Sequence, residues 1–127
     1  MRKNFLILLT GFLFAFGLSS CYYDVESQLY PNSNANCDTL TVTYSTTIRN
    51  ILQNNSCLGC HSGSAVSGGN IVLDNYNSVK TYAQNGRLYG SVSHGAGYSP
   101  MPQGGNKISG CNILQIKKWI DSGILNN

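Results

Sequence analysis

Apolar residues recur at helical spacing near the middle of the chain. Ile48, Ile51 and Leu52 follow one another at positions i, i+3 and i+4, which places their side chains on one face of an α-helix. Ser45 precedes this stripe and is a candidate N-cap, because its hydroxyl can accept a hydrogen bond from a free backbone N–H. The pattern predicts a short amphipathic helix that ends near Asn54.

The clearest helical pattern lies near the end of the sequence. Its apolar positions form a wide stripe, which consists of Ile113, Leu114, Ile116, Trp119 and Ile120. The polar positions between them are Lys117, Lys118 and Asp121. Ser109 is a candidate N-cap, and Gly123 stands where a left-handed glycine commonly follows a helix. We expect an amphipathic helix between these two residues.

Two further short helices are predicted in between, over about 77–84 and 87–93. Asp74 or Asn75 is positioned to cap the first of them. Residues 95–105 are rich in glycine and proline and too long for a simple connection, which suggests a functional loop. No run of alternating apolar and polar residues indicates strands. The expected fold class is therefore all-α, with about four short helices.

The first 20 residues have the composition of a bacterial export signal. Arg2 and Lys3 give a positive start, and residues 5–17 form an uncharged apolar run that is too short to span a bilayer. Small residues then precede Cys21, as in the lipobox of bacterial lipoproteins. We expect residues 1–20 to be a signal peptide and Cys21 to carry lipid. An ordinary secretory signal or an uncleaved anchor are the alternatives, and each of them exports the domain.

Composition divides the remainder into a tether and one small domain. Residues 21–36 are polar, contain Pro31 and lack periodicity, which predicts a flexible tether after the lipidated cysteine. Residues 37–127 form the predicted domain, whose limited apolar core would benefit from a large cofactor or a disulfide. The 127-residue chain carries eight basic and five acidic side chains. Loss of Arg2 and Lys3 with the signal leaves a charge of +1 and no basic patch for nucleic acid.

The sequence Cys57-Leu58-Gly59-Cys60-His61 is the strongest chemical motif. The spacing C-x-x-C-H allows two thiols to bond to the vinyl groups of one haem while the adjacent histidine binds the iron. A thioredoxin-like redox pair would need a βαβ context, and a zinc site would need a second pair of ligands. A structural disulfide between Cys57 and Cys60 would leave His61 without a role. We therefore expect one covalent haem c.

The remaining cysteines are Cys37 and Cys111, at the start of the domain and of its last helix. Because an exported protein lies outside the reducing cytosol, a disulfide between them is the favoured prediction, and two separate thiols are the alternative.

Met101 is the leading candidate for the second axial ligand of the iron. It lies between Pro100 and Pro102 in the glycine-rich loop, where the prolines stiffen the backbone and the glycines allow it to approach a flat ring closely. A thioether is a soft, neutral donor that favours ferrous iron. His94 is the rival ligand, and an open or water-ligated iron is the third alternative.

Four segments of the chain resemble single-haem, class I c-type cytochrome domains of bacterial envelope lipoproteins. They are YSTTIRNILQNNSCLGCH (44–61), SGGNIVLDNY (67–76), SPMP (99–102) and ILQIKKWIDSGI (113–124). The resemblance implies a small cytochrome c-like fold, with the helices wrapped round one covalent haem and Met101 as the distal ligand. It also implies that the first and last helices pack across each other, and that Leu73 and Tyr76 line the haem pocket, although core packing alone would explain both. The Cys37–Cys111 pair is not a general feature of such domains.

The function implied is that of an electron carrier and not an enzyme, because iron held by His61 and Met101 has no open site for a substrate. Whether the domain serves a larger oxidoreductase as a subunit stays open. The alternative is a peroxidase-like haem enzyme or a ligand sensor with a vacant distal position. The expected partners are redox proteins of the respiratory chain or a periplasmic dehydrogenase. The expected location is the cell envelope, with a lipid anchor in a membrane and the domain facing the periplasm or the exterior.

Overall fold

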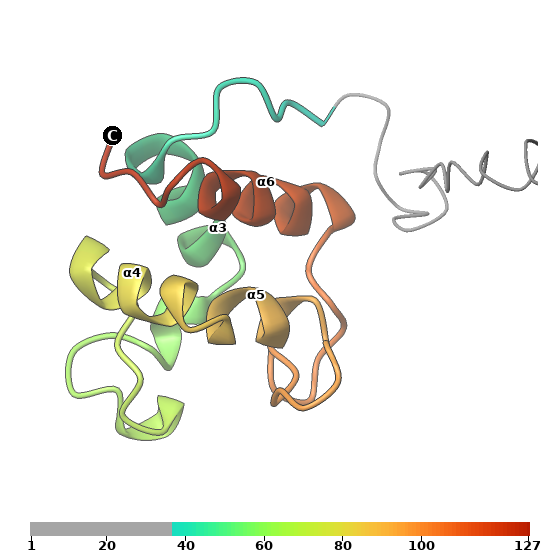
Figure 1. Cartoon of the computed structure of the whole chain (residues 1–127). Coiled ribbons are helices and arrows are strands. Elements are labelled where there is room, and N and C mark those ends of the chain that lie inside the picture. The colour runs from blue at the N-terminus through green and yellow to red at the C-terminus, as the bar shows by residue number, and fades with distance from the viewer. Residues whose placement is uncertain (1–36) are drawn as a thin grey trace, which may run out of the picture.

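The computed structural model describes residues 37–127, and the regular secondary structure in this range is entirely helical (Figure 1). Its elements are the π-helical turn η1 (Tyr44–Ile48), the α-helices α3 (Arg49–Asn54), α4 (Tyr76–Gln84), α5 (Arg87–Val92) and α6 (Gly110–Asp121), and the short 3-10 turns η2 (Cys57–Gly59) and η3 (Val66–Gly68). The all-α prediction is thus confirmed for this part of the chain. No helix within it is long and apolar enough to cross a bilayer. The predicted signal peptide, the lipid site Cys21 and the tether at 21–36 lie outside the described residues.

The first helix begins two residues earlier than the sequence pattern predicts. Its N-cap is Thr43, whose Oγ1 accepts a hydrogen bond from the backbone N–H of Thr46 at 3.3 Å. The prediction of Ser45 as the cap was therefore wrong. The helix runs through η1 directly into α3, which ends at Asn54 as predicted.

Helix α6 has both predicted ends. The Ser109 hydroxyl accepts from the N–H of Asn112 at 3.2 Å, and Gly123 follows the helix with a φ of +98°. The N–H of Gly123 donates to the carbonyl of Ile120, and the N–H of Ile124 donates to that of Trp119, both at 3.1 Å. This pair of bonds is a Schellman motif, in which the glycine supplies the left-handed backbone.

The two middle helices also occur where the sequence predicts them. Of the two candidate caps for α4, Asn75 fills the position, and its side-chain oxygen accepts from the N–H of Ser78 at 3.0 Å. Helix α5 begins directly after Gly86, whose φ is +78°, so the chain turns between α4 and α5 within two residues. These two helices pack against each other, and α5 also contacts α6.

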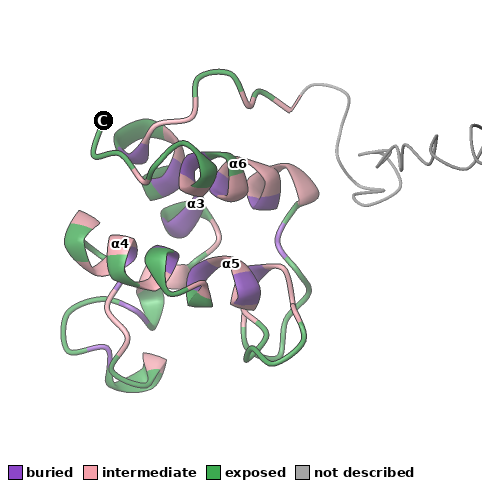
Figure 2. Cartoon of the chain, in the orientation of Figure 1, coloured by how far each residue is buried: buried purple, intermediate pink, exposed green. Residues whose placement is uncertain are grey.

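The core lies where the inner faces of the helices meet (Figure 2). Its most completely buried side chains are Ile48, Leu52, Val79, Ile116 and Trp119. The predicted contact between the first and last helices is confirmed, because η1 packs on α6 and their apolar stripes share one core. Tyr44 extends this core, with its ring 5.8 Å from that of Trp119 and 5.1 Å from that of Tyr76, centroid to centroid.

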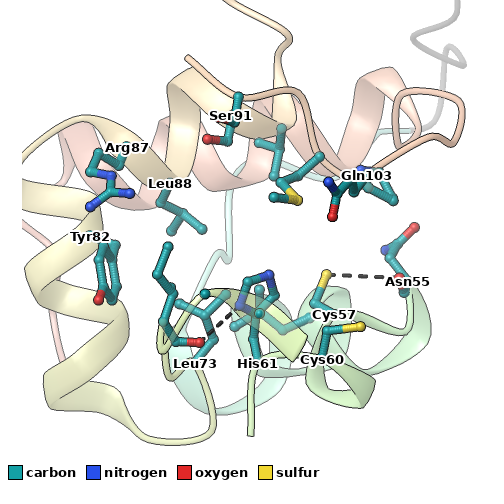
Figure 3. Close-up of a pocket in the computed structure, with 18 of the residues that line it drawn as sticks. Asn55, Cys57, Cys60, His61, Leu73, Tyr82, Arg87, Leu88, Ser91 and Gln103 are labelled. Carbon is teal, nitrogen blue, oxygen red and sulfur yellow. Dashed lines mark hydrogen bonds between the residues drawn. The ribbon is translucent and has the colours of Figure 1, made fainter. Parts of the chain in front are cut away.

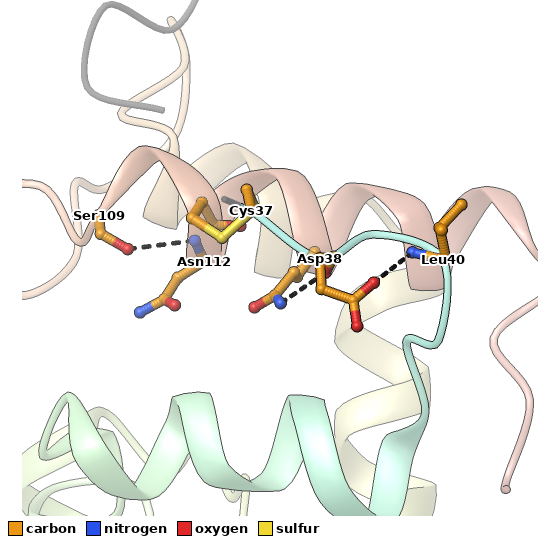
Figure 4. The surroundings of a disulfide bond; sticks show 7 residues. Cys37, Asp38, Leu40, Ser109 and Asn112 are labelled. Atoms are coloured by element: carbon orange, nitrogen blue, oxygen red, sulfur yellow. Dashed lines mark hydrogen bonds between the residues drawn. A yellow bond between two sulfur atoms is a disulfide. The ribbon is translucent and has the colours of Figure 1, made fainter. Parts of the chain in front are cut away.

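A disulfide joins Cys37 to Cys111, as the sequence predicts (Figure 4). It attaches the segment that precedes η1 to the first turn of α6. The Gln115 side-chain amide donates to the carbonyl of Asp38 at 2.8 Å, which adds a second connection beside the bond. The start of the domain is therefore fixed to its last helix.

Candidate cofactor site

A cavity of about 820 Å³ lies between the Cys57–His61 segment, helices α4 and α5, and the glycine-rich loop. Figure 3 shows Cys57, Cys60 and His61 on one side of it and Leu88 and Ser91 of α5 on the other. Leu52, Ile71, Leu73, Leu88 and Val92 give the lining its apolar character. The volume is within the range of about 300–1,000 Å³ that is usual for small-molecule and cofactor sites.

The C-x-x-C-H motif forms a single helical turn at the wall of this cavity. Ser56 precedes it with a φ of +58°, a left-handed conformation that separates α3 from the turn. The N–H of His61 donates to the carbonyl of Cys57 at 2.9 Å, and the N–H of Cys60 donates to the same carbonyl at 3.3 Å. The turn brings both thiols and the imidazole to the cavity, since Cys57, Cys60 and His61 all line it.

The two thiols of the motif differ in environment. Both are free, so the predicted alternative of a disulfide between them is not what the structure contains. Cys60 is exposed, whereas Cys57 is half-buried, and this burial raises the pKa of the Cys57 thiol because it disfavours the charged thiolate. The Cys57 Sγ lies 3.8 Å from the carbonyl oxygen of Asn55. Both cysteines therefore line the cavity with thiols that are not engaged in a disulfide.

The imidazole of His61 is buried and held in one orientation. Nδ1 of its ring lies 2.8 Å from the carbonyl oxygen of Ile71. The residue as a whole is only 8% exposed. Because a carbonyl can only accept, Nδ1 must carry the hydrogen of this bond, and Nε2 is left as the ring nitrogen that could bind a metal. A backbone carbonyl on the other ring nitrogen is the usual arrangement for a histidine that binds a metal.

Gly68 gives this imidazole the space it occupies. A Cβ added at position 68 would lie 2.4 Å from Nδ1 of His61 and 2.5 Å from the carbonyl oxygen of Cys60. Neither atom is the end of a flexible side chain, so any larger residue would displace the ring. The position is therefore restricted to glycine by space alone, because its φ is not in the left-handed region.

Met101 also lines the cavity, from the loop that follows α5. Its N–H donates to the carbonyl of Ser91 at 3.0 Å, and its own carbonyl accepts from Nε2 of His94 at 3.0 Å. His94 is not among the residues that line the cavity. The peptide bond between Met101 and Pro102 is cis.

Several expectations about the lining need correction. Residues 95–105 contain four glycines, which were expected to let the loop backbone approach the cofactor, and only Gly97 of them lines the cavity. Gly95 instead lies against Gly90, and Gly104 and Gly105 also do not line it. Leu73 lines the cavity as the resemblance implies. Tyr76 does not: it packs on the Tyr44 ring, and its hydroxyl donates to the carbonyl of Ile124 at 2.8 Å.

The polar part of the lining could not be found from the sequence motif. Arg87 and Tyr82 line the cavity together, with the guanidinium 5.5 Å from the centroid of the Tyr82 ring. The Tyr98 ring lies against α5 at Gly90, where an added Cβ would lie 2.4 Å from the ring. Nothing in the local sequence connects these residues to the motif, because they come from different elements.

No protein-family model matches the sequence, and no curated protein or solved structure has a significant match to it.

Proposed function

We propose that this protein is a lipid-anchored electron carrier with one covalently bound haem c. The observation that supports this best is that a single cavity gathers Cys57, Cys60, His61 and Met101. The motif and the methionine are 40 residues apart in the sequence, so their meeting does not follow from proximity in the chain. Cys57 and Cys60 would hold the haem through thioether bonds, and His61 and Met101 would be the axial ligands of its iron.

The residues of the cavity fit such a group. Its lining is mainly apolar, as a porphyrin ring requires, and its volume is in the range of cofactor sites. Nε2 of His61, the ring nitrogen that is not bonded to Ile71, would be the donor that a haem iron takes from a proximal histidine. A haem supplies the four equatorial ligands itself, so the protein needs to contribute only one nitrogen and one sulfur.

When bound, the haem would supply one-electron oxidation and reduction at its iron. The protein's part is to hold the group and its two axial donors. The carbonyl of Ile71 keeps the imidazole of His61 in one tautomer and orientation. The apolar side chains of Leu52, Leu73 and Val92 line the cavity and would keep water away from the bound haem. With both axial positions filled, the site would have no place for a substrate, and this favours electron transfer over an enzymatic reaction.

A peroxidase-like enzyme or a ligand sensor would need a vacant distal position and a polar group to steer the chemistry. His94 is the only histidine of the chain besides His61 and is therefore the residue to consider for this role. In the structure its Nε2 donates to the carbonyl of Met101 and its side chain does not line the cavity. The arrangement of the loop therefore favours the carrier over the alternative with an open site.

The proposed location rests on the sequence of the first 36 residues. Lipid on Cys21 would anchor the chain in a membrane of the cell envelope, and residues 21–36 would form a tether with a root-mean-square length of about 20 Å. The domain would face the periplasm or the exterior. It would exchange electrons with proteins of the respiratory chain or with a periplasmic dehydrogenase, as a free carrier or as a subunit of a larger oxidoreductase.

The experiment that tests the proposal is expression of the full chain in a bacterium that makes c-type cytochromes. We expect a red protein whose intact mass exceeds that of the polypeptide by one haem, measured after acid denaturation. Replacing both Cys57 and Cys60 with alanine should abolish the attachment. A matched control is Cys21→Ala, which removes the proposed lipid site and should leave the haem in place. A colourless wild-type protein without added haem mass would contradict the proposal.

The distal ligand has its own test. Met101→Leu keeps an apolar side chain of similar volume but removes the sulfur. In the wild-type ferric protein we expect a low-spin spectrum with a weak long-wavelength charge-transfer band, which is typical of a sulfur ligand. The variant should lose this band while keeping covalent haem. An unchanged spectrum would show that Met101 is not a ligand.

A further inference from the structure

The backbone of Met101 is fixed on both sides by the end of helix α5 and the turn that follows it. Its N–H donates to the carbonyl of Ser91, and its carbonyl accepts from Nε2 of His94, each at 3.0 Å. Because the carbonyl can only accept, Nε2 of His94 must carry the hydrogen. Residues 96–100 of the intervening loop are exposed. The two bonds therefore close the loop at its base, next to the residue that lines the cavity.

His94 adopts an unfavourable backbone conformation to make this contact. Its φ is +55°, in the left-handed region that costs a residue with a Cβ about 1 kcal/mol or more. Its own N–H donates to the carbonyl of Ser91 at 3.2 Å, so this carbonyl accepts from both His94 and Met101. The left-handed turn directs the chain back along α5. A strained residue that makes a specific contact beside a functional site suggests a role there.

We propose that His94 is a positioning residue that fixes Met101 at the iron. This inference rests on the proposed function, since it assigns His94 a role only if Met101 is an axial ligand. The hydrogen bond holds the peptide group of Met101, and this limits how far its thioether can move from the cavity. The restraint matters most in the oxidised protein, because a thioether is a soft donor that favours ferrous iron. Without it, an external ligand should compete more successfully for ferric iron.

The test uses two substitutions in the full-length, haem-loaded protein. His94→Gly removes the hydrogen-bond donor and also relieves the left-handed strain, because glycine adopts a positive φ freely. His94→Gln keeps an N–H donor at a similar distance from the backbone. Tyr76→Phe is the control, since it removes one hydrogen bond from the far side of the core, where the hydroxyl contacts Ile124. For each protein one measures the apparent affinity of the ferric form for added imidazole, together with its unfolding midpoint in urea.

We expect His94→Gly to bind imidazole about fivefold more tightly than the wild type, the factor that corresponds to one lost neutral hydrogen bond. His94→Gln and Tyr76→Phe should stay close to the wild-type affinity. The urea midpoint of His94→Gly should change little, because relief of strain offsets the lost bond. If His94 had only a structural role, the imidazole affinity of every variant, Tyr76→Phe included, would instead rise as its urea midpoint falls.

Three results would overturn the inference, and haem mass and spectrum separate a failure of the proposed function from a failure of the role of His94 alone. If His94→Gly keeps covalent haem and the charge-transfer band but binds imidazole like the wild type, His94 does not position Met101, and the proposed electron carrier is unaffected. If the wild type carries no covalent haem, the proposed function fails and the role of His94 fails with it. If His94→Gly does not accumulate, His94→Ala, which also lacks the donor, takes its place, and a wild-type imidazole affinity of that variant would likewise overturn the inference.

Discussion

At the scale of single residues, the packing around His61 leaves no room for a side chain at position 68. An alanine Cβ there would lie 2.4 Å from Nδ1 of His61, so the ring must move and its hydrogen bond to Ile71 must lengthen. We expect Gly68→Ala to destabilise the protein by about 1–3 kcal/mol, as overpacking of a core usually does. In the haem-loaded protein the variant should also weaken the low-spin spectrum, which absorption spectroscopy measures.

Gly59→Ala is the matched control for this substitution. Gly59 lies inside the same motif, but a Cβ added there meets nothing within 4 Å, and its φ is not left-handed. We expect this variant to retain the wild-type spectrum and a nearly unchanged unfolding midpoint. If both alanine variants behaved alike, the close approach of Gly68 to His61 would not be what restricts the site.

A single carboxylate, that of Asp74, holds the segment that follows His61. It accepts from the N–H of Gly63 at 3.0 Å and from the side-chain amide of Asn75, also at 3.0 Å. These hydrogen bonds, led by that of Gly63, hold the pKa of Asp74 below its ordinary value of 3.8. A lowered pKa in the folded state means that the carboxylate stabilises the fold above the unfolded pKa, and that this contribution is lost as the pH falls through the folded one.

We therefore expect Asp74→Asn to lower the urea midpoint at neutral pH, because an amide cannot replace the charged acceptor fully. The difference from the wild type should persist down to about pH 4 and disappear in more acidic solution, where the wild-type carboxyl is itself protonated. Urea unfolding curves at several pH values between 2 and 7 measure this. A difference that stayed constant through the acidic range would mean that the charge of Asp74 has no part in it.

At the scale of the helices, the start of η1 is set by Thr43. Its Oγ1 accepts from the N–H of Thr46, whereas no such bond from the Ser45 hydroxyl occurs within residues 37–127. Because the cap side chain is the acceptor of this bond, Thr43→Ala should lower the free energy of unfolding by about 1 kcal/mol, the usual cost of a lost N-cap. Ser45→Ala, the matched control, should have a much smaller effect. If urea unfolding showed a larger loss of stability for Ser45→Ala than for Thr43→Ala, the cap would be Ser45, as the sequence pattern suggests.

The helices show which features a sequence predicts well. The ends of α6 follow from neighbouring residues, because Ser109 and Gly123 act through hydrogen bonds within one or two turns. The start of η1 does not follow from neighbouring residues alone, since Thr43 and Ser45 are both suitable caps. The choice is made by Tyr44, which is only 7% exposed and packs on Trp119 from α6. A contact across 75 positions is not visible in a local pattern.

The candidate site likewise has a part that the sequence predicts and a part that it does not. Its chemical groups could be predicted, because Cys57, Cys60 and His61 form one contiguous motif and Met101 is the only methionine outside the start of the chain. The backbone groups that hold these residues in place could not be predicted. The acceptor for His61 is the backbone carbonyl of Ile71, and every residue has a carbonyl, so no residue type marks it. The same holds for the carbonyl of Ser91 that binds Met101.

At the scale of the whole molecule, the Cys37–Cys111 bond closes a loop that contains most of the described domain. The two cysteines are 74 positions apart in the sequence, and the segment between them contains η1, α3, α4, α5 and the entire candidate site. The core between these elements is small and is interrupted by a large cavity. A restraint on the unfolded chain is therefore a substantial part of what favours the folded state.

Replacing both Cys37 and Cys111 with serine should lower the free energy of unfolding by up to about 4–5 kcal/mol, as expected from chain entropy for a loop of this length. The double substitution avoids an unpaired thiol that could react with the motif. Urea unfolding of the haem-loaded protein measures the change, and a reductant added to the wild type should move its midpoint in the same direction. The serine variant should not respond to the reductant. Equal midpoints for wild type and variant without reductant would mean that the remaining contacts already fix the part of the chain that the bond restrains. The stability of the domain would then have to come from the proposed haem and from the core around it.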